Sequence, residues 1–248
     1  MTKKAWLIFA VVCVGLIGGL VYLSTSNKID VSTVDTQQIQ KATAQNGNIA
    51  EHTYGNMNSK VILIEYADYQ CPGCGASFSM VKSLTEKYKD KMGYIFRNYP
   101  LTSAHPNAFA AAATAEAAGL QGKFWEMHDV LFTNQASWKA LSGADRTNYF
   151  VSEAESLGLD GAKLRSQLDS VDIKRKIEFD LALGKKDGVT GTPGFFIDGK
   201  EVGNQDVKDG KLVPADQDSS SPSVWSSADL FETYIIKPAF AAKGISLD

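Results

Sequence analysis

Residues 61–74, V-I-L-I-E-Y-A-D-Y-Q-C-P-G-C, decide the fold of this chain. The first half of this stretch is almost continuously apolar and contains β-branched residues, which is typical of a strand buried in the centre of a sheet. An amphipathic helix is expected over 72–89, because apolar residues recur there every three or four positions and Pro72 suits a first helical turn. The sequence therefore predicts a strand, a cysteine pair and a helix in direct succession.

The cysteine pair Cys71 and Cys74 lies where the predicted strand ends and the predicted helix begins. The positive end of a helix dipole stabilises a thiolate over a thiol, and the thiolate is the form that attacks disulfides. Zinc sites also use a Cys-x-x-Cys pair. A purely structural disulfide is disfavoured, because closing so short a loop removes little entropy from the unfolded chain. The pattern favours a redox site.

The composition is that of a globular protein with an ample core: 248 residues, of which 44% are hydrophobic and 21% charged. A formal net charge of −3 gives no electrostatic case for nucleic-acid binding. The third cysteine, Cys13, lies in an N-terminal apolar stretch. A framework of structural disulfides would need more cysteines than remain.

The N-terminus predicts export from the cytosol. Residues 5–23 carry no charge and follow Lys3 and Lys4, so they are expected to form a transmembrane anchor with residues 1–4 in the cytoplasm. A cleaved signal peptide is the alternative, and it also delivers the rest of the chain outside the cytosol. The polar residues 24–48 are interpreted as a flexible linker.

The rest of the chain, 49–248, predicts alternating helices and strands. A second strand is expected at 94–96, and a long helical region at about 104–186. Strands are expected again at 194–197 and, after an Asp-Gly turn, at 200–202. Residues 203–227 are interpreted as a polar loop, and a last helix is expected over 228–242 with a break near its proline.

These features together resemble the DsbA-like thiol–disulfide oxidoreductases of the thioredoxin superfamily, over 49–248. The resemblance rests on the Cys-Pro-Gly-Cys motif after a strand, on the helical block, and on G-T-P-G-F-F-I at 191–197. It implies an α/β thioredoxin-like fold, in which helices flank a central mixed sheet, with an all-helical subdomain inserted at about 104–186 and a transmembrane helix in front.

The resemblance assigns roles around the motif. Cys71 would be the exposed nucleophile and Cys74 the buried resolving cysteine. Thr192–Pro193 would be a cis peptide facing the sulfurs, and the Thr192 backbone could pair with an extended substrate segment. Pro72 and Gly73 would also contact substrate. Strongly oxidising members carry a histidine where this chain has Gly73, and typical DsbA has valine where it has Thr192, so the redox direction stays open.

Glu65 is a charged residue within the apolar strand, at a position where family members often carry a buried acid. Its implied role is to accept or relay the proton of Cys74, with a pKa raised by desolvation. The alternative is a position exposed to water. Asp68 is expected to be a solvated loop residue.

The chain has three histidines. His128 lies on an apolar helical stripe and is expected in the core, and His105 precedes a proline at a helix start, as a cap or surface residue. A zinc site would need two histidines to converge on the cysteine pair, and neither these two nor His52 shows ligand spacing. No metal or cofactor is therefore expected.

The leading hypothesis is an extracytoplasmic enzyme that forms disulfides in exported proteins with cysteines. By resemblance, a quinone-linked membrane oxidase would be its reoxidant. One alternative is a disulfide reductase or isomerase with the same active site. Another is a non-catalytic, membrane-anchored binding or holdase module, which would keep the fold without using the cysteines.

Overall fold

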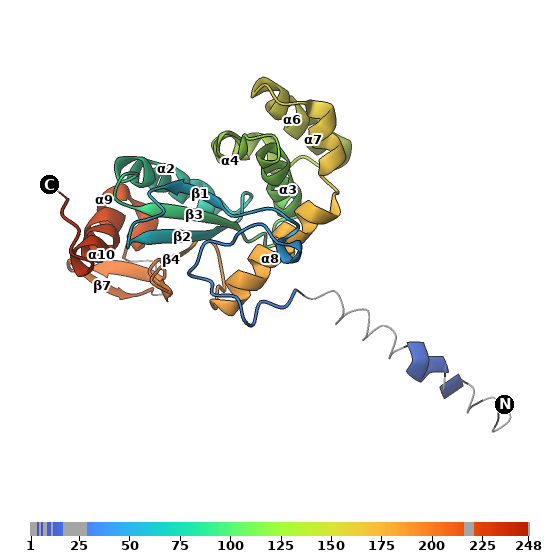
Figure 1. The fold of residues 1–248 in the computed structure, drawn as a ribbon, viewed down its shortest axis with the longest axis horizontal. Helices are drawn as coiled ribbons and strands as arrows, with labels where there is room; N and C mark the ends of the chain where they lie inside the picture. Colours follow the sequence, from blue (N-terminus) through green and yellow to red (C-terminus); the bar gives the residue numbers. More distant parts are fainter. Residues whose placement is uncertain are drawn as a thin grey trace.

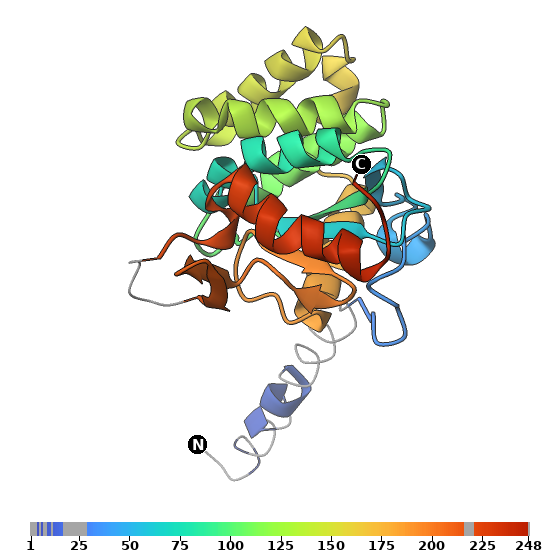
Figure 2. The same cartoon turned by 90° about the vertical axis from the view of Figure 1, so that its left-hand side faces the viewer.

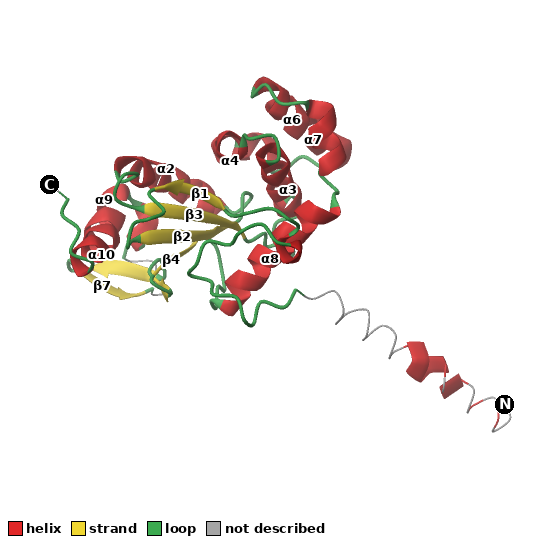
Figure 3. Cartoon of the chain, viewed as in Figure 1, coloured by secondary structure: helices red, strands yellow, loops and turns green. Residues whose placement is uncertain are grey.

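The computed structural model describes residues 29–215 and 221–247, together with residues 4, 6, 9, 10 and 12–16. It contains a mixed sheet flanked by helices (Figures 1 and 3). Most of the predicted anchor over 5–23 lies outside the described residues. Among the helices of the described residues, none is long and apolar enough to cross a membrane.

The main sheet has five strands in the order β1-β3-β2-β4-β5. The central strand β2 (Ile62–Ala67) is parallel to β3 (Gly93–Asn98) and antiparallel to β4 (Gly194–Ile197). The edge strands are β1 (His52–Gly55) and β5 (Lys200–Glu201). The predicted central strand and mixed sheet are confirmed.

The alternation of side chains along β2 gives the sheet two different faces. The first face of the sheet, which holds Glu65, packs against α2 (Pro72–Lys87) and the C-terminal helices. The second face, which holds Tyr66, packs against α8 (Val171–Lys186). Figure 2 shows α2 lying between the helical insertion and the C-terminal helices. Neighbouring residues of β2 therefore point into two different environments, one on each face of the sheet.

A glycine allows α8 to lie close to the sheet. A Cβ atom at Gly184 would come within 2.6 Å of the Tyr99 ring and 3.0 Å of the Tyr66 ring. Real Cβ contacts are not this short, so a side chain here would push the helix away from the second face.

The helical insertion lies between β3 and β4, as predicted, at one end of the sheet (Figure 1). Asp160 and Ser170 cap two of its helices by accepting hydrogen bonds from the backbone N–H of Lys163 and Ile173. Before α8, its helices are α3 (Ala108–Gly119), α4 (Phe124–Thr133), α5 (Gln135–Trp138), α6 (Gly143–Ser156) and α7 (Gly161–Gln167).

The predicted polar loop over 203–227 is wrong in part, because it contains a second hairpin. Strands β6 (Gln205–Lys208) and β7 (Lys211–Pro214) pair across Asp209–Gly210, and both turn residues have positive φ. Asp198–Gly199 makes the same kind of turn between β4 and β5, where it was predicted. The signal for the second hairpin was the same Asp-Gly pair, but its flanks lack a long apolar run.

The last helical segment covers the predicted range without a break. It runs through α9 (Ala228–Phe231), a π-helical turn η3 (Glu232–Ile236) and α10 (Lys237–Ala242). Proline cannot donate the backbone hydrogen bond of a helix interior. The π turn ends at Ile236, and Pro238 lies in the first turn of α10, where a missing N–H is tolerated.

The prediction of a flexible linker over 24–48 is wrong for residues 29–48, which pack against the end of α8. The Lys186 ammonium donates to the backbone carbonyls of Val31, Ser32 and Val34 at 3.0, 2.7 and 2.6 Å. The Thr36 hydroxyl donates to Asp187 at 2.5 Å. Polar composition suggested a solvated chain, but here the polar groups have partners within the fold.

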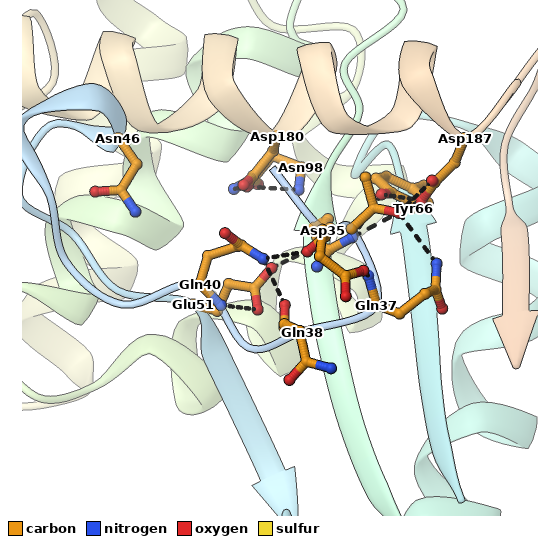
Figure 4. Close-up of polar contacts among 12 residues, drawn as sticks. Asp35, Gln37, Gln38, Gln40, Asn46, Glu51, Tyr66, Asn98, Asp180 and Asp187 are labelled. Atoms are coloured by element: carbon orange, nitrogen blue, oxygen red, sulfur yellow. Dashed lines mark hydrogen bonds and ion pairs between the residues drawn. The ribbon is translucent and has the colours of Figure 1, made fainter. Parts of the chain in front are cut away.

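A buried polar network joins this N-terminal segment to the second face of the sheet (Figure 4). Arg97 donates to Glu51 through Nε and to the Tyr66 hydroxyl through Nη1, both at 2.6 Å. The Tyr66 hydroxyl in turn donates to Asp187 at 2.7 Å. The Arg97 and Glu51 side chains are both fully buried, so each charge depends on the other.

Replacing Arg97 with methionine is expected to lower the free energy of unfolding by about 3–5 kcal/mol, because it leaves Glu51 as an uncompensated buried charge. Urea denaturation of the full chain measures this loss. The matched control Lys174→Met removes a cation that is 64% exposed and should leave the midpoint unchanged.

The double variant Arg97→Met/Glu51→Leu removes both charges and should recover most of the lost stability. If Arg97→Met unfolds at the wild-type urea concentration, the network does not hold the N-terminal segment in place.

Candidate active site

The two cysteines lie at the start of α2, at the end of the sheet where β2 stops. Cys71 is the N-cap residue, with extended backbone, and Pro72 occupies the first helical position. The Cys71 carbonyl accepts the first helical hydrogen bond, from the Gly75 N–H at 3.0 Å. The Cys71 sulfur is therefore held beside the free N–H groups and the positive end of the helix.

The two sulfurs differ in their access to solvent. Cys71 retains 8% of its exposure, whereas Cys74 retains none. The expectation that Cys71 is exposed is therefore wrong: the fold around the start of α2 buries most of it, although less completely than Cys74. The order of access is the one expected of a nucleophile and a resolving cysteine.

The surroundings of Cys71 favour its thiolate and lower its pKa to about 5. A hydrogen bond from the Cys74 side chain is the largest cause. Burial opposes it, while the Thr192 side chain and the backbone N–H groups of Cys74 and Gly73 add to it. In the thiol form, Cys71 Sγ donates to the Thr192 carbonyl at 3.3 Å.

The pKa of Cys74 is shifted in the opposite direction, upward. Burial raises its pKa well above the ordinary value, and the hydrogen bond to Cys71 adds to that shift. The Asp68 N–H, 3.5 Å from Cys74 Sγ, favours its thiolate. The pair therefore holds one proton, on Cys74, at neutral pH.

The Thr192–Pro193 peptide bond is cis, as expected. The proline lies against the motif: a Cβ atom at Gly73 would be 3.3 Å from Pro193 Cδ and 3.7 Å from Cys71 Sγ. The Thr192 hydroxyl is buried, and it acts on the Cys71 sulfur by favouring its thiolate. The structure thus brings Cys71, Gly73, Thr192 and Pro193 together, as the sequence predicted.

Glu65 is buried, with 3% of its surface exposed, so the alternative of a solvent-facing position is wrong. Burial raises its pKa to about 7, and the hydrogen bond from Tyr94 partly opposes this shift. The Tyr94 hydroxyl donates to Glu65 Oε2 at 2.5 Å. A carboxyl group with this pKa can take up or release a proton near neutral pH.

The prediction that Asp68 is solvated is wrong, because only 1% of it is exposed. Its carboxylate accepts from the N–H groups of Gln70 and Leu101, at 2.7 and 2.8 Å, and lies 2.7 Å from Nδ1 of His105. His105 is neither a cap nor a free surface residue. The pair fixes the loop that leads into Cys71, a role visible only once the chain is folded.

Gln135 is a second residue that the sequence did not reveal. It lies in the helical insertion, and its Nε2 donates to the Tyr69 and Cys71 carbonyls at 2.8 and 2.9 Å. A Cβ atom at Gly75 would come within 2.9 Å of the Gln135 amide, so a larger residue there would displace this amide from the two carbonyls. Through these two hydrogen bonds, the helical insertion holds the backbone at the cysteine motif in place.

The histidines bind carboxylates. His52 Nε2 lies 2.8 Å from Glu116, and His128 Nδ1 lies 3.2 Å from Asp129. His128 is buried, as predicted. Within residues 29–215 and 221–247 and the few described N-terminal positions, no group of three or more His, Cys, Asp or Glu side chains could hold a metal ion.

Solved structures with this architecture include disulfide-exchange proteins. Alpha-DsbA1 from Wolbachia pipientis is 25% identical, with a TM-score of 0.58 over 78% of this chain and 93% of that chain. BdbD from Bacillus subtilis, crystallised in its oxidised form, is 17% identical and shares the fold, with a TM-score of 0.59 over 83% of this chain and 99% of that one. MdbA from Corynebacterium diphtheriae, a thiol–disulfide oxidoreductase, is 22% identical with a TM-score of 0.55, over 71% and 94%.

Curated relatives overlap with only part of this chain. A Na⁺/H⁺ antiporter, NhaA 3 of Salinispora tropica, is 39% identical over 150 residues, which are 60% of this chain but only 22% of the antiporter. The NhaA antiporter of Herminiimonas arsenicoxydans is 30% identical over 64% of this chain and 24% of its own length. This chain thus spans less than a quarter of either relative, and the overlap gives no argument for ion transport.

The family model for thioredoxin matches residues 47–212, which contain the central strands, the cysteine pair and the proline segment. The chain therefore belongs to the thioredoxin family, and its inserted helices give it the architecture of the DsbA-type thiol–disulfide oxidoreductases.

Proposed function

We propose that this protein forms disulfide bonds in exported proteins by exchange through Cys71 and Cys74. The observation that carries the proposal is that the pKa values of two neighbouring thiols shift in opposite directions. The pKa of Cys71 falls to about 5, while burial raises that of Cys74. A non-catalytic module would have no need of this asymmetry.

The reaction starts from the oxidised pair. A substrate thiolate attacks Cys71 Sγ, the bond between the two cysteines breaks, and Cys74 leaves as a thiolate that takes up a proton. A second substrate thiolate then attacks the substrate sulfur of the mixed disulfide and releases Cys71 as a thiolate. The substrate loses two electrons and gains a disulfide, and the enzyme pair is reduced.

The lowered pKa of Cys71 favours the oxidising direction. A thiol of low pKa leaves readily, and a stabilised thiolate stabilises the reduced enzyme, which makes its disulfide a stronger oxidant. The second candidate is a reductase or isomerase with the same residues. It is favoured by Gly73, which has no side chain to support the thiolate.

The residues around the sulfurs would have two roles, proton transfer and substrate alignment. Glu65 would accept or supply the proton of Cys74, because it is buried on the same face of the sheet and its charge acts on that thiol. Thr192 and Pro193 would align an extended substrate segment beside Cys71, and Pro72 and Gly73 would form the other side of that contact.

The place of action is proposed to be outside the cytosol, where disulfides persist. Lys3 and Lys4 before the apolar residues 5–23 favour an anchor with its N-terminus inside and the domain outside. The folded unit would include residues 29–48 as well as 49–248, because the former pack on α8. A quinone-linked membrane oxidase would return the cysteines to the disulfide.

The trapping of mixed disulfides tests the function. Cys74→Ser is expected to accumulate covalent complexes with thiol-containing proteins through Cys71, because the resolving sulfur is gone. Non-reducing gels of cells that express the full chain would show them. The double variant Cys71→Ser/Cys74→Ser should form none.

Purified full-length protein in oxidised form should also restore disulfides to a reduced, unfolded protein. Lack of any exchange by the wild type would overturn the proposal and favour a binding role. Exchange without net oxidation would favour the isomerase.

Thr192→Val is expected to make the reduction potential more negative, because it removes a hydroxyl that lowers the pKa of Cys71 and so stabilises the reduced form. Equilibration with a glutathione buffer measures the potential. Thr190→Val makes the same change at an exposed position on the same segment, and should leave the potential unaltered. An unaltered potential in Thr192→Val would contradict the role of this hydroxyl.

Glu65→Gln is expected to gain stability relative to the wild type as the pH rises. The folded-state pKa of about 7 lies above the ordinary 4.5, so the wild type keeps full stability below pH 4.5 and loses part of it up to pH 7. The loss should be about 3 kcal/mol, and the glutamine cannot titrate. Denaturation at several pH values measures the difference, and a constant difference would show that Glu65 ionises normally.

A further inference from the structure

Asp68 lies between β2 and α2, and its main chain contacts both cysteines of the motif. The Asp68 N–H donates to Cys74 Sγ at 3.5 Å, and the Asp68 carbonyl accepts a hydrogen bond from the Cys71 N–H at 3.0 Å. The position of this one residue therefore affects the surroundings of both members of the pair.

The Asp68 side chain is fixed because both of its carboxylate oxygens have partners. Oδ1 accepts from the Gln70 N–H at 2.7 Å, and Oδ2 accepts from the Leu101 N–H at 2.8 Å. Oδ2 also lies 2.7 Å from Nδ1 of His105. Asp68 is only 1% exposed, so these groups take the place of the water that a carboxylate otherwise binds.

His105 reaches Asp68 from the segment that leads into the helical insertion. Its backbone N–H donates to the Leu101 carbonyl at 2.8 Å, and this turn brings the Leu101 N–H and the His105 ring to the same carboxylate oxygen. A carboxylate can only accept, so the hydrogen of this contact is on Nδ1. The Gln70 and Leu101 donors are backbone groups, whereas His105 contributes a side chain, which substitution can remove.

We propose that His105 is a positioning residue for disulfide exchange: through the Asp68 carboxylate it holds the Asp68 N–H against Cys74 Sγ. The inference rests on the proposed function, because it concerns the step in which Cys74 carries negative charge. It gives the His105–Asp68 pair a role in the reaction beyond fixing the loop before α2.

Cys74 becomes a thiolate in both directions of exchange. When a substrate thiolate forms a bond to Cys71 Sγ, the bond between the two cysteines breaks and its electron pair stays on Cys74, which later takes up a proton. In the reverse step the Cys74 thiolate attacks the mixed disulfide. Burial disfavours this thiolate, and the Asp68 N–H opposes that effect. A hydrogen bond to a charged acceptor is about twice as strong as one to a neutral acceptor, so the contact gains strength as the charge forms.

The test follows both thiols in one reaction. Reduced full-length protein in a Cys13→Ser background is mixed with a symmetrical aromatic disulfide whose thiolate is coloured. The Cys71 thiolate attacks first and releases one aromatic thiolate, and the Cys74 thiolate then attacks the mixed disulfide and releases the second. The first phase of colour therefore reports on Cys71 and the second phase on Cys74.

His105→Leu is expected to slow the second phase roughly threefold to tenfold. A weaker N–H contact reduces the thiolate fraction of Cys74, and the higher nucleophilicity of the remaining thiolate offsets part of that loss. The first phase and the pH midpoint of Cys71 alkylation should stay at wild-type values, because the groups that lower the pKa of Cys71 lie in α2 and at Thr192. A loosened motif would change both phases.

Three further variants complete the test. His105→Asn places an amide N–H where Nδ1 lies, and should restore most of the second-phase rate. His105→Gln, whose amide extends beyond that position, should slow the second phase and replaces the leucine variant if that variant does not fold. His52→Leu removes another largely buried histidine that contacts a buried carboxylate, Glu116, and should keep both phases even if it lowers stability.

A wild-type second phase in His105→Leu and His105→Gln would overturn the positioning role and leave the proposed function standing. An equal loss in both phases would also overturn it, because His105 would then only support the fold. Release of a single aromatic thiolate by the wild-type pair would show that Cys74 does not complete the exchange, and would overturn both.

Discussion

The hydrogen bond between the side chains of Cys74 and Cys71 is the interaction on which the site depends. It places the single proton of the pair on the buried sulfur and the negative charge on the outer one, at the start of α2. Burial alone would disfavour charge on both sulfurs. At Cys71 alone the thiolate is favoured, by the helix terminus, the N–H groups of the motif and the Thr192 side chain. A nucleophile and a protonated partner follow from this asymmetry.

The sheet keeps two kinds of buried charge apart. On its first face, Glu65 lies among apolar and aromatic side chains and accepts a hydrogen bond from Tyr94, and burial raises its pKa to about 7. On the second face, Arg97 binds Glu51 within a network that secures the N-terminal segment. Adjacent positions on a strand point to opposite faces. Glu65 can therefore change its charge on the face opposite to these ion pairs.

The sequence predicted the parts of this site that depend on local pattern. An apolar run before Cys71 placed the motif at a strand–helix junction, and Asp198–Gly199 gave the turn after β4. The partners of Asp68 and Gln135 could not be predicted, because His105 and the Cys71 carbonyl reach them only through tertiary folding. The prediction of a flexible linker was wrong for residues 29–48, because composition does not show whether a polar group binds water or another part of the protein.

Titration of the reduced protein by the ultraviolet absorbance of its thiolates tests the central claim most directly. In a Cys13→Ser background only the two active-site thiols remain. One thiolate is expected to appear with a midpoint near pH 5, while the second thiol stays protonated beyond pH 9. Two thiols that both begin to ionise only near pH 9 would contradict the account.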